Sequence, residues 1–310
     1  MTGKERLFAV LDGKIPDKIP HFEIEFQIEQ EAFGIRRPSY NELINADPDE
    51  KKILLENYFS VCENLIERYD WCAIRAENSF YGPYEGEFIP MAKERFGERA
   101  AVYSANGDGT FWMPSGEQFM DFTIRLFEDF PSLLKEARKK CDVSIELAYK
   151  QIKQGADFIL INSDYGYNQG PFISPYMFSE LVTPFLKEIV DAIHSMGKKA
   201  ILHSDGDLRL LLDQLVSTGL DGYQSVDPQG NMDISEVKKN YPDLILMGNV
   251  QTSLLQEVND ELIRQSVRYA INSAKSGGKY IFSTSNCIFE GMPLESYEIM
   301  LDEYEKLAWY

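Results

Sequence analysis

The chain has 310 residues, of which 44% are hydrophobic, so it can bury a large core without a disulfide or a metal ion to stabilise it. Its 50 acidic and 31 basic residues give a net charge of -19 at pH 7. Nucleic acids and anionic membranes both require a basic protein surface, so this charge argues against either as a partner.

The first half of the chain contains few regular patterns. Two segments, Ile19–Phe26 and Trp71–Ala76, have the composition of strands. Residues Ala101–Met113 predict a hairpin, because the turn-forming residues Asn106–Gly109 lie in the middle of the segment. A long helical pattern, Leu133–Gln154, then leads into the second half.

Polar and apolar residues alternate strictly within Ile19–Phe26. In a barrel strand, the apolar set Phe22, Ile24 and Phe26 would face the outer helices, and the polar set would face inward. Glu25, the last acidic residue of that set, is therefore expected to line the barrel mouth. A partly exposed strand would show the same alternation, so that alternative stays open.

The second half alternates short strand patterns with longer helical patterns. The expected strands are Asp157–Asn162, Lys199–His203, Gly222–Val226, Leu244–Val250 and Lys279–Ser283. The expected helices are Ser174–Met196, Asp207–Ser217, Asp233–Asn240 and Asn259–Lys275. Glycine or proline follows each helix, as expected where a helix ends before a strand.

This alternation predicts parallel βαβ units in an α/β protein. We expect one (β/α)8 TIM barrel spanning residues 1–310, with a helical segment at its N-terminus. A doubly wound sheet is the alternative, but no GxGxxG motif follows the first strand, which weakens a dinucleotide-binding fold.

Functional groups of such barrels gather at the carboxyl ends of the strands. His203 ends one predicted strand, and Asp205 lies on the same face of the extended chain two residues later. Cys287 follows the last strand, and imidazole, carboxylate and thiolate together can bind zinc. A hydrogen-bonded structural histidine is the alternative. Three other strand ends supply further candidates, namely Glu77, Asp164 with Tyr165, and Asp227.

The four cysteines, Cys62, Cys72, Cys141 and Cys287, form no CxxC pair, which is typical of a reducing compartment. The N-terminal residues are charged where a signal peptide would be apolar, and no apolar run approaches the roughly 18 residues of a membrane span. We therefore expect a soluble, cytoplasmic protein with no membrane partner.

Several short motifs together resemble the uroporphyrinogen decarboxylase-like superfamily. The similar segments are Thr2–Pro20, Gly155–Asp157, Ser163–Gly166, Gly170–Pro175 and His203–Leu208. The resemblance extends from about Thr2 to the C-terminus, and it implies a single (β/α)8 barrel.

Within that superfamily, the chain resembles the corrinoid-dependent methyltransferases of the methylcobamide:coenzyme M type. The resemblance implies a zinc ion bound by His203 and Cys287, with Asp205 where the family has a cysteine and with Asp227 or Glu77 as a fourth ligand. It also implies methyl transfer from a methylcorrinoid, held by a separate corrinoid-binding protein, to a thiol or folate. On this basis we assign His203, Asp205 and Cys287 catalytic roles, and Glu25, Glu77, Asp164 and Tyr165 substrate-binding roles.

Two alternatives remain open at this point. True decarboxylases of the superfamily carry an Arg-Gln-Ala-Gly-Arg run that binds an acidic tetrapyrrole, whereas this chain has Phe22–Gln27, without arginine. Acidic residues there would repel such a substrate, which disfavours decarboxylation. The second alternative is a metal-free binding homologue, which Asp205 in place of a cysteine would favour.

Overall fold

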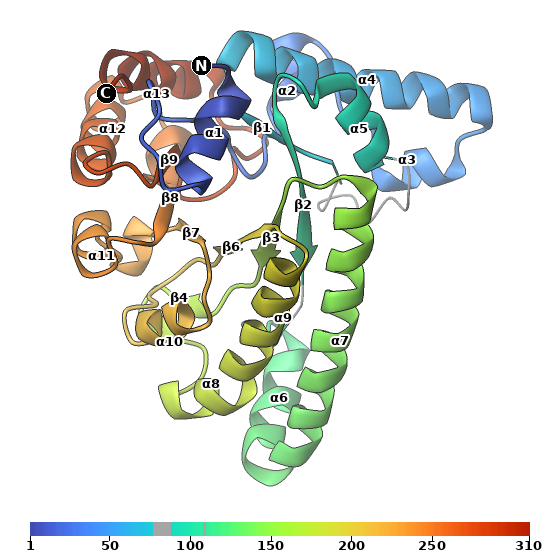
Figure 1. Cartoon of the computed structure of the whole chain (residues 1–310), viewed down its shortest axis with the longest axis vertical. Coiled ribbons are helices and arrows are strands. Elements are labelled where there is room, and N and C mark those ends of the chain that lie inside the picture. Colours follow the sequence, from blue (N-terminus) through green and yellow to red (C-terminus); the bar gives the residue numbers. More distant parts are fainter. Residues whose placement is uncertain (77–87, 108–109) are drawn as a thin grey trace.

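A computed structural model of the chain describes residues 1–76, 88–107 and 110–310. Within them, seven parallel strands form one curled sheet in the order β1-β2-β3-β6-β7-β8-β9, consistent with a TIM-barrel-like fold (Figure 1). These strands are β1 (Ala73–Arg75), β2 (Ala101–Gly107), β3 (Phe158–Asn162), β6 (Lys199–His203), β7 (Gly222–Ser225), β8 (Ile245–Val250) and β9 (Tyr280–Thr284). A small antiparallel pair, β4 (Gly166–Tyr167) and β5 (Gly170–Pro171), follows β3.

Helices precede the sheet and connect its strands. Those of the first half are α1 (Gly3–Leu11), α2 (Glu29–Phe33), α3 (Tyr40–Asn45), α4 (Pro48–Tyr69), α5 (Phe88–Phe96), α6 (Glu117–Glu128) and α7 (Phe130–Gln154). Those of the second half are α8 (Pro175–Leu181), α9 (Thr183–Ser195), α10 (Leu212–Ser217), α11 (Ile234–Asn240), α12 (Asp260–Ala274) and α13 (Leu294–Leu307), with short 3-10 turns η1 (Pro228–Gly230) and η2 (Thr252–Gln256).

The segment Ile19–Phe26 connects the two edge strands of the sheet without forming a regular strand. Its His21 makes parallel bridges to Trp71, just before β1, and to Phe282 of β9. The backbone N–H of Cys72 donates to the His21 carbonyl, and that of Phe282 donates to the Pro20 carbonyl, each at 2.9 Å. The expected first strand is thus an irregular segment between β9 and β1, and the described sheet has seven strands rather than eight.

Because this segment is irregular, the predicted alternation of its side chains is wrong. Phe22 lies 5.4 Å from the ring of Tyr103 and 6.2 Å from that of Phe158. Phe158 and Asn162 are four residues apart on β3, so their side chains face the same side of the sheet. Asn162 pairs with His203, so Phe158 lies on the inner face with His203. Phe22 therefore fills the barrel interior, whereas Phe26 packs outward against Tyr297 of α13 at 5.2 Å.

The second-half strands are confirmed to within a residue or two at their ends, but two other expectations are wrong. Residues Ala101–Gly107 form one parallel strand paired with both β1 and β3, and no returning strand follows in residues 110–113. The helix expected over Ser174–Met196 is divided into α8 and α9 near Pro184, which has no N–H for a continuous helix.

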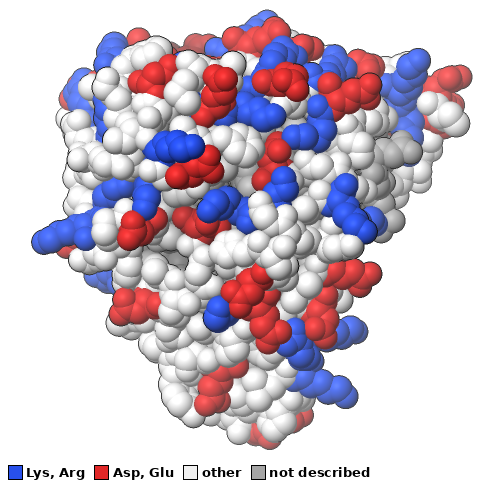
Figure 2. All heavy atoms as spheres, in the orientation of Figure 1, with Lys and Arg blue, Asp and Glu red and all other residues white. Residues whose placement is uncertain are grey.

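No helix within the described ranges has both the length and the apolar composition required to cross a membrane. The charged side chains on the face in Figure 2 are of both signs and are intermixed, and that face carries no continuous basic surface.

Candidate functional site

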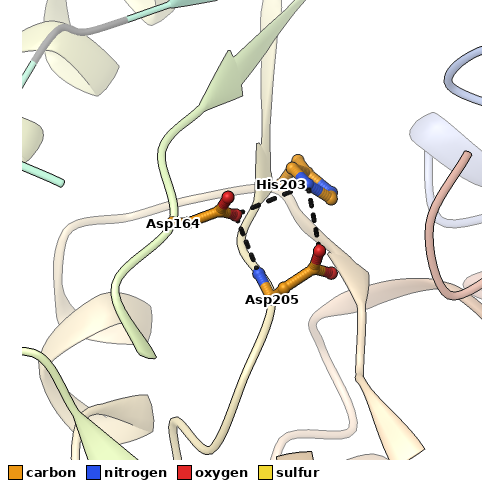
Figure 3. A group of neighbouring side chains, drawn as sticks. All are labelled: Asp164, His203 and Asp205. Carbon is orange, nitrogen blue, oxygen red and sulfur yellow. Dashed lines mark hydrogen bonds and ion pairs between the residues drawn. The ribbon is translucent and has the colours of Figure 1, made fainter. Parts of the chain in front are cut away.

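Three side chains converge at the carboxyl ends of two neighbouring strands. Asp164 follows β3, His203 is the last residue of β6, and Asp205 follows β6 (Figure 3). The Nε2 atom of His203 lies 3.6 Å from Asp164 Oδ1 and 3.9 Å from Asp205 Oδ2. One potential ligand atom from each residue lies within 4.8 Å of the other two, so the three residues can hold one metal ion.

Gln224 fixes the orientation and the tautomer of His203. Its Nε2 donates to the carbonyls of Thr284 at 3.2 Å and Ser285 at 3.4 Å, so its Oε1 is left to accept from His203 Nδ1. In the neutral imidazole the proton is then on Nδ1, and the Nε2 lone pair points toward the two carboxylates. A hydrogen bond of this kind on the distal nitrogen is typical of metal-binding histidines.

Asp205 is held by two side chains from later strands. Ser225 Oγ donates to Asp205 Oδ1 at 2.6 Å, and Asn286 Nδ2 donates to Oδ2. Burial raises the pKa of the Asp205 carboxyl to about 6, an effect that the nearby His203 opposes and the nearby Asp164 reinforces. A cation at this position would relieve the cost of the buried charge.

Asp164 lies on the open side of the cluster. Its Oδ1 accepts from the backbone N–H of Asp205 at 3.1 Å, and its side chain is 42% exposed, against 6% for His203. Figure 3 shows its carboxylate directed at His203 from the left, while the Asp205 carboxylate approaches the same imidazole from below. Sequence reasoning placed Asp164 among the substrate-binding residues, whereas its position is that of a potential metal ligand.

Cys287 lies outside this group of ligand atoms, so the structure does not bring together the predicted trio of His203, Asp205 and Cys287. Its backbone N–H donates to Asn286 Oδ1 at 2.6 Å, and the residue is 5% exposed. Burial, reinforced by the Glu25 carboxylate, raises the pKa of the Cys287 thiol, so the thiol is protonated at neutral pH.

The other predicted site residues have structural partners or lie outside the described residues. Asp227, the suggested fourth ligand, accepts from the backbone N–H groups of Gly206 at 3.3 Å and Gln229 at 2.9 Å and is not part of the ligand group. Tyr165 has no exposed surface, and its hydroxyl lies 2.6 Å from Thr110 Oγ1, so the structure does not place it on a surface open to substrate. Glu77 lies outside the described residues.

Glu25 is buried and paired rather than exposed at the mouth. Arg37 Nη2 lies 2.5 Å from Glu25 Oε1, and Arg37 Nε lies 3.1 Å from Glu29 Oε1. The side chain of Arg37 is 8% exposed, that of Glu25 is 2% exposed and that of Glu29 is 4% exposed. The expected acidic wall at Glu25 is therefore an internal ion-pair network.

Sequence reasoning missed Gln224, Asn286 and Arg37. Gln224 pairs in register with His203 on the adjacent strand, so the strand-end rule applied to neighbouring positions would have found it. Asn286 was visible only as the neighbour of Cys287. Nothing in the local pattern around Arg37 indicated that it would enter the barrel wall.

Comparisons with known proteins identify relatives of two kinds. Residues 115–307 match the family described as "Uroporphyrinogen decarboxylase (URO-D)". A uroporphyrinogen decarboxylase of Dichelobacter nodosus is 22% identical over 160 residues, covering 51% of this chain and 43% of that protein. The methylcobamide:CoM methyltransferase MtbA of Methanosarcina acetivorans is 25% identical over 169 residues, covering 53% of this chain and 44% of that protein. The matches thus span less than half the length of these relatives.

Among solved structures, a methyltransferase from Methanosarcina mazei superposes with a TM-score of 0.75 over 99% of both chains, at 17% sequence identity. At that identity the likeness concerns the fold. The superposition includes the part of the chain before residue 115, where the family match begins.

Proposed function

The chain belongs to the uroporphyrinogen decarboxylase family, and from that premise we propose that it is a methyltransferase acting on a methylated, protein-bound corrinoid. The acceptor would be a thiol or a folate bound at the barrel mouth. The observation that carries the proposal is the cluster of Asp164, His203 and Asp205, which can hold a cation at the carboxyl ends of the strands. The relative named as a methylcobamide:CoM methyltransferase supports the same reaction class.

The resemblance implies zinc, and the cluster fits such an ion through one imidazole and two carboxylates rather than through thiolates. A bound cation would supply Lewis-acid activation of the acceptor, lowering the pKa of a thiol held next to it. The protein's own residues hold that position. Gln224 keeps the His203 Nε2 lone pair available, and Ser225 and Asn286 fix the Asp205 carboxylate.

We propose that the methyl donor is presented by a separate corrinoid-binding protein, and we retain the assignment of residues 1–310 to one barrel domain. Asp164 is the most exposed member of the cluster. The acceptor and the donor would therefore approach from its side of the mouth.

Decarboxylation of an acidic tetrapyrrole is the second candidate, because one of the matched relatives is named as a uroporphyrinogen decarboxylase. Two observations disfavour it. The mouth carries the carboxylates of Asp164 and Asp205, which would repel a polycarboxylate. The buried Arg37 is already paired with Glu25 and Glu29. A metal-free binding homologue is the third candidate.

The test is demethylation of free methylcobalamin by the purified chain with a panel of thiols and tetrahydrofolate. The reaction is monitored through the change in the cobalamin absorption spectrum. We expect turnover with one acceptor class, its loss in His203→Ala, and its retention in Tyr304→Phe, a buried substitution in α13 whose hydroxyl donates to the Ile19 carbonyl. If no acceptor supports demethylation and the chain releases carbon dioxide from a porphyrinogen, the result would support the decarboxylase. Inactivity in both assays would support the binding homologue.

A further inference from the structure

We propose that the barrel mouth binds a divalent cation through Asp164, His203 and Asp205, and that Cys287 is excluded from its coordination. Relative to Zn²⁺, this site accepts a hard ion such as Mn²⁺ more readily than a site with thiolate ligands does. This inference rests on the proposed function, because it concerns the same cluster at the barrel mouth. Its test measures metal binding rather than turnover, so either idea can fail without the other.

The strongest indication of a bound cation is the state of His203 Nε2. The side chain of His203 is more than nine-tenths buried, and its Nδ1 is occupied by Gln224. Within residues 1–76, 88–107 and 110–310, its Nε2 lies 3.6 and 3.9 Å from carboxylate oxygens of Asp164 and Asp205, beyond hydrogen-bonding distance of either. A ring nitrogen at these distances from two carboxylates leaves room for an ion that all three residues could contact.

The outer contacts of this set are already in place. Gln224 orients His203, Ser225 and Asn286 orient Asp205, and the backbone N–H of Asp205 orients Asp164. Such outer partners fix ligand geometry in metal sites. The carboxylate of Asp164 therefore takes the place that the sequence prediction gave to the thiolate of Cys287.

Asn286 connects Asp205 to the backbone of Cys287. Its amide bridges the two residues, since Nδ2 donates to Asp205 Oδ2 while Oδ1 accepts from the backbone N–H of Cys287. This bridge fixes the Asp205 carboxylate and the backbone at Cys287. The Cys287 thiol is not among the ligand atoms that lie within 4.8 Å of one another.

The donor atoms determine the class of ion. Two carboxylates and one imidazole are hard or borderline ligands, which suit Mn²⁺ and similar ions, whereas thiolates favour zinc. Zinc remains the tighter ion at most sites with nitrogen and oxygen ligands, so the inference concerns the ratio of affinities. Without a thiolate, this site should favour Zn²⁺ over Mn²⁺ by a smaller factor than a site that has a cysteine in place of Asp205.

The first experiment is titration of the full chain with Mn²⁺ alone. The concentration of free Mn²⁺ is measured by electron paramagnetic resonance. We expect one Mn²⁺ per chain for the wild type, a loss of affinity of at least about tenfold for Asp164→Asn, and a change of less than about twofold for Cys287→Ser. Circular dichroism of each variant checks that the fold is retained. Unchanged binding by Asp164→Asn, loss of binding by Cys287→Ser, or no binding by the wild type would overturn the inference.

The second experiment uses Co²⁺ and Zn²⁺ as probes. The Co²⁺-loaded wild type should lack the near-ultraviolet charge-transfer band of a cobalt–thiolate bond, whereas Asp205→Cys should gain it. The same substitution should raise the preference for Zn²⁺ over Mn²⁺ by at least about tenfold. A thiolate band in the wild type that disappears in Cys287→Ser would contradict the proposal. If Mn²⁺ binds as described but methylcobalamin is not demethylated, this inference stands and the proposed function fails.

Discussion

Gln224→Leu tests whether the imidazole of His203 is oriented for metal binding. The side chain of Gln224 is fully buried and makes hydrogen bonds to His203, to the Thr284 carbonyl at 3.2 Å and to the Ser285 carbonyl at 3.4 Å. Leucine would fill a similar volume but leave the Nδ1–H and two carbonyls without this partner. Each buried group left unsatisfied costs about 1–3 kcal/mol of stability.

The effect on metal binding is separate from the effect on stability. Losing an outer partner of a metal-binding histidine typically weakens metal affinity about 10–100-fold, which corresponds to about 1.4–2.7 kcal/mol. We therefore expect Gln224→Leu to bind Mn²⁺ at least about tenfold more weakly than the wild type while remaining folded at 25 °C. Calorimetric titration and urea unfolding measure the two effects on the same preparation.

Tyr304→Phe is the matched control for a buried hydrogen bond lost elsewhere. It removes the hydrogen bond that the Tyr304 hydroxyl donates to the Ile19 carbonyl at 2.6 Å, without touching His203. It should lower the free energy of unfolding by about 1–3 kcal/mol and leave Mn²⁺ affinity unchanged. Equal losses of affinity in both variants would refute the reasoning, because metal binding would then follow global stability. So would wild-type affinity in a folded Gln224→Leu.

Two further predictions concern charge. Arg37→Met should destabilise the protein by about 3–5 kcal/mol in urea unfolding, because it leaves Glu25 and Glu29 buried without their cation; a loss below about 1 kcal/mol would mean that water reaches both carboxylates. Metal binding should depend on pH through Asp205, whose raised pKa of about 6 leaves it mostly protonated at pH 5. Asp205 should then contribute a released proton on binding at pH 5 and almost none at pH 8, measured by calorimetry in buffers of different ionisation enthalpy. Equal release at both pH values would show that another group titrates.

The second-half strands and the placement of His203 and Asp205 could be predicted because local patterns determine them. Buried parallel strands are continuous apolar runs, and the barrel rule places whatever follows such a run at the mouth. That rule identifies the side chains near the mouth, but it does not tell how deeply each side chain is buried or which other groups it contacts. Asp164 and Cys287 were both found by this rule, and only their tertiary hydrogen bonds distinguish them.

The first half was harder to predict because its residues alternate as in a strand where the backbone does not form one. Ile19–Phe26 alternates like a strand, yet its backbone makes only isolated bridges, so Phe22 and Phe26 face opposite sides of the barrel wall. Glu23, one of the polar residues of this segment, accepts from the backbone N–H of Thr284 at 2.9 Å and from its hydroxyl at 2.7 Å. Partners this far away in sequence cannot be inferred from local periodicity.

The central claim is that Asp164, His203 and Asp205 form a metal-binding functional centre at the barrel mouth. Anomalous X-ray diffraction from crystals grown with Mn²⁺, recorded above and below the manganese absorption edge, tests it directly. The account predicts one anomalous peak in contact with one atom of each residue, at about the 2.0–2.2 Å expected for nitrogen and oxygen ligands of a first-row ion. A peak bound to Cys287 Sγ, or no peak at the mouth in crystals that contain the ion elsewhere, would contradict it.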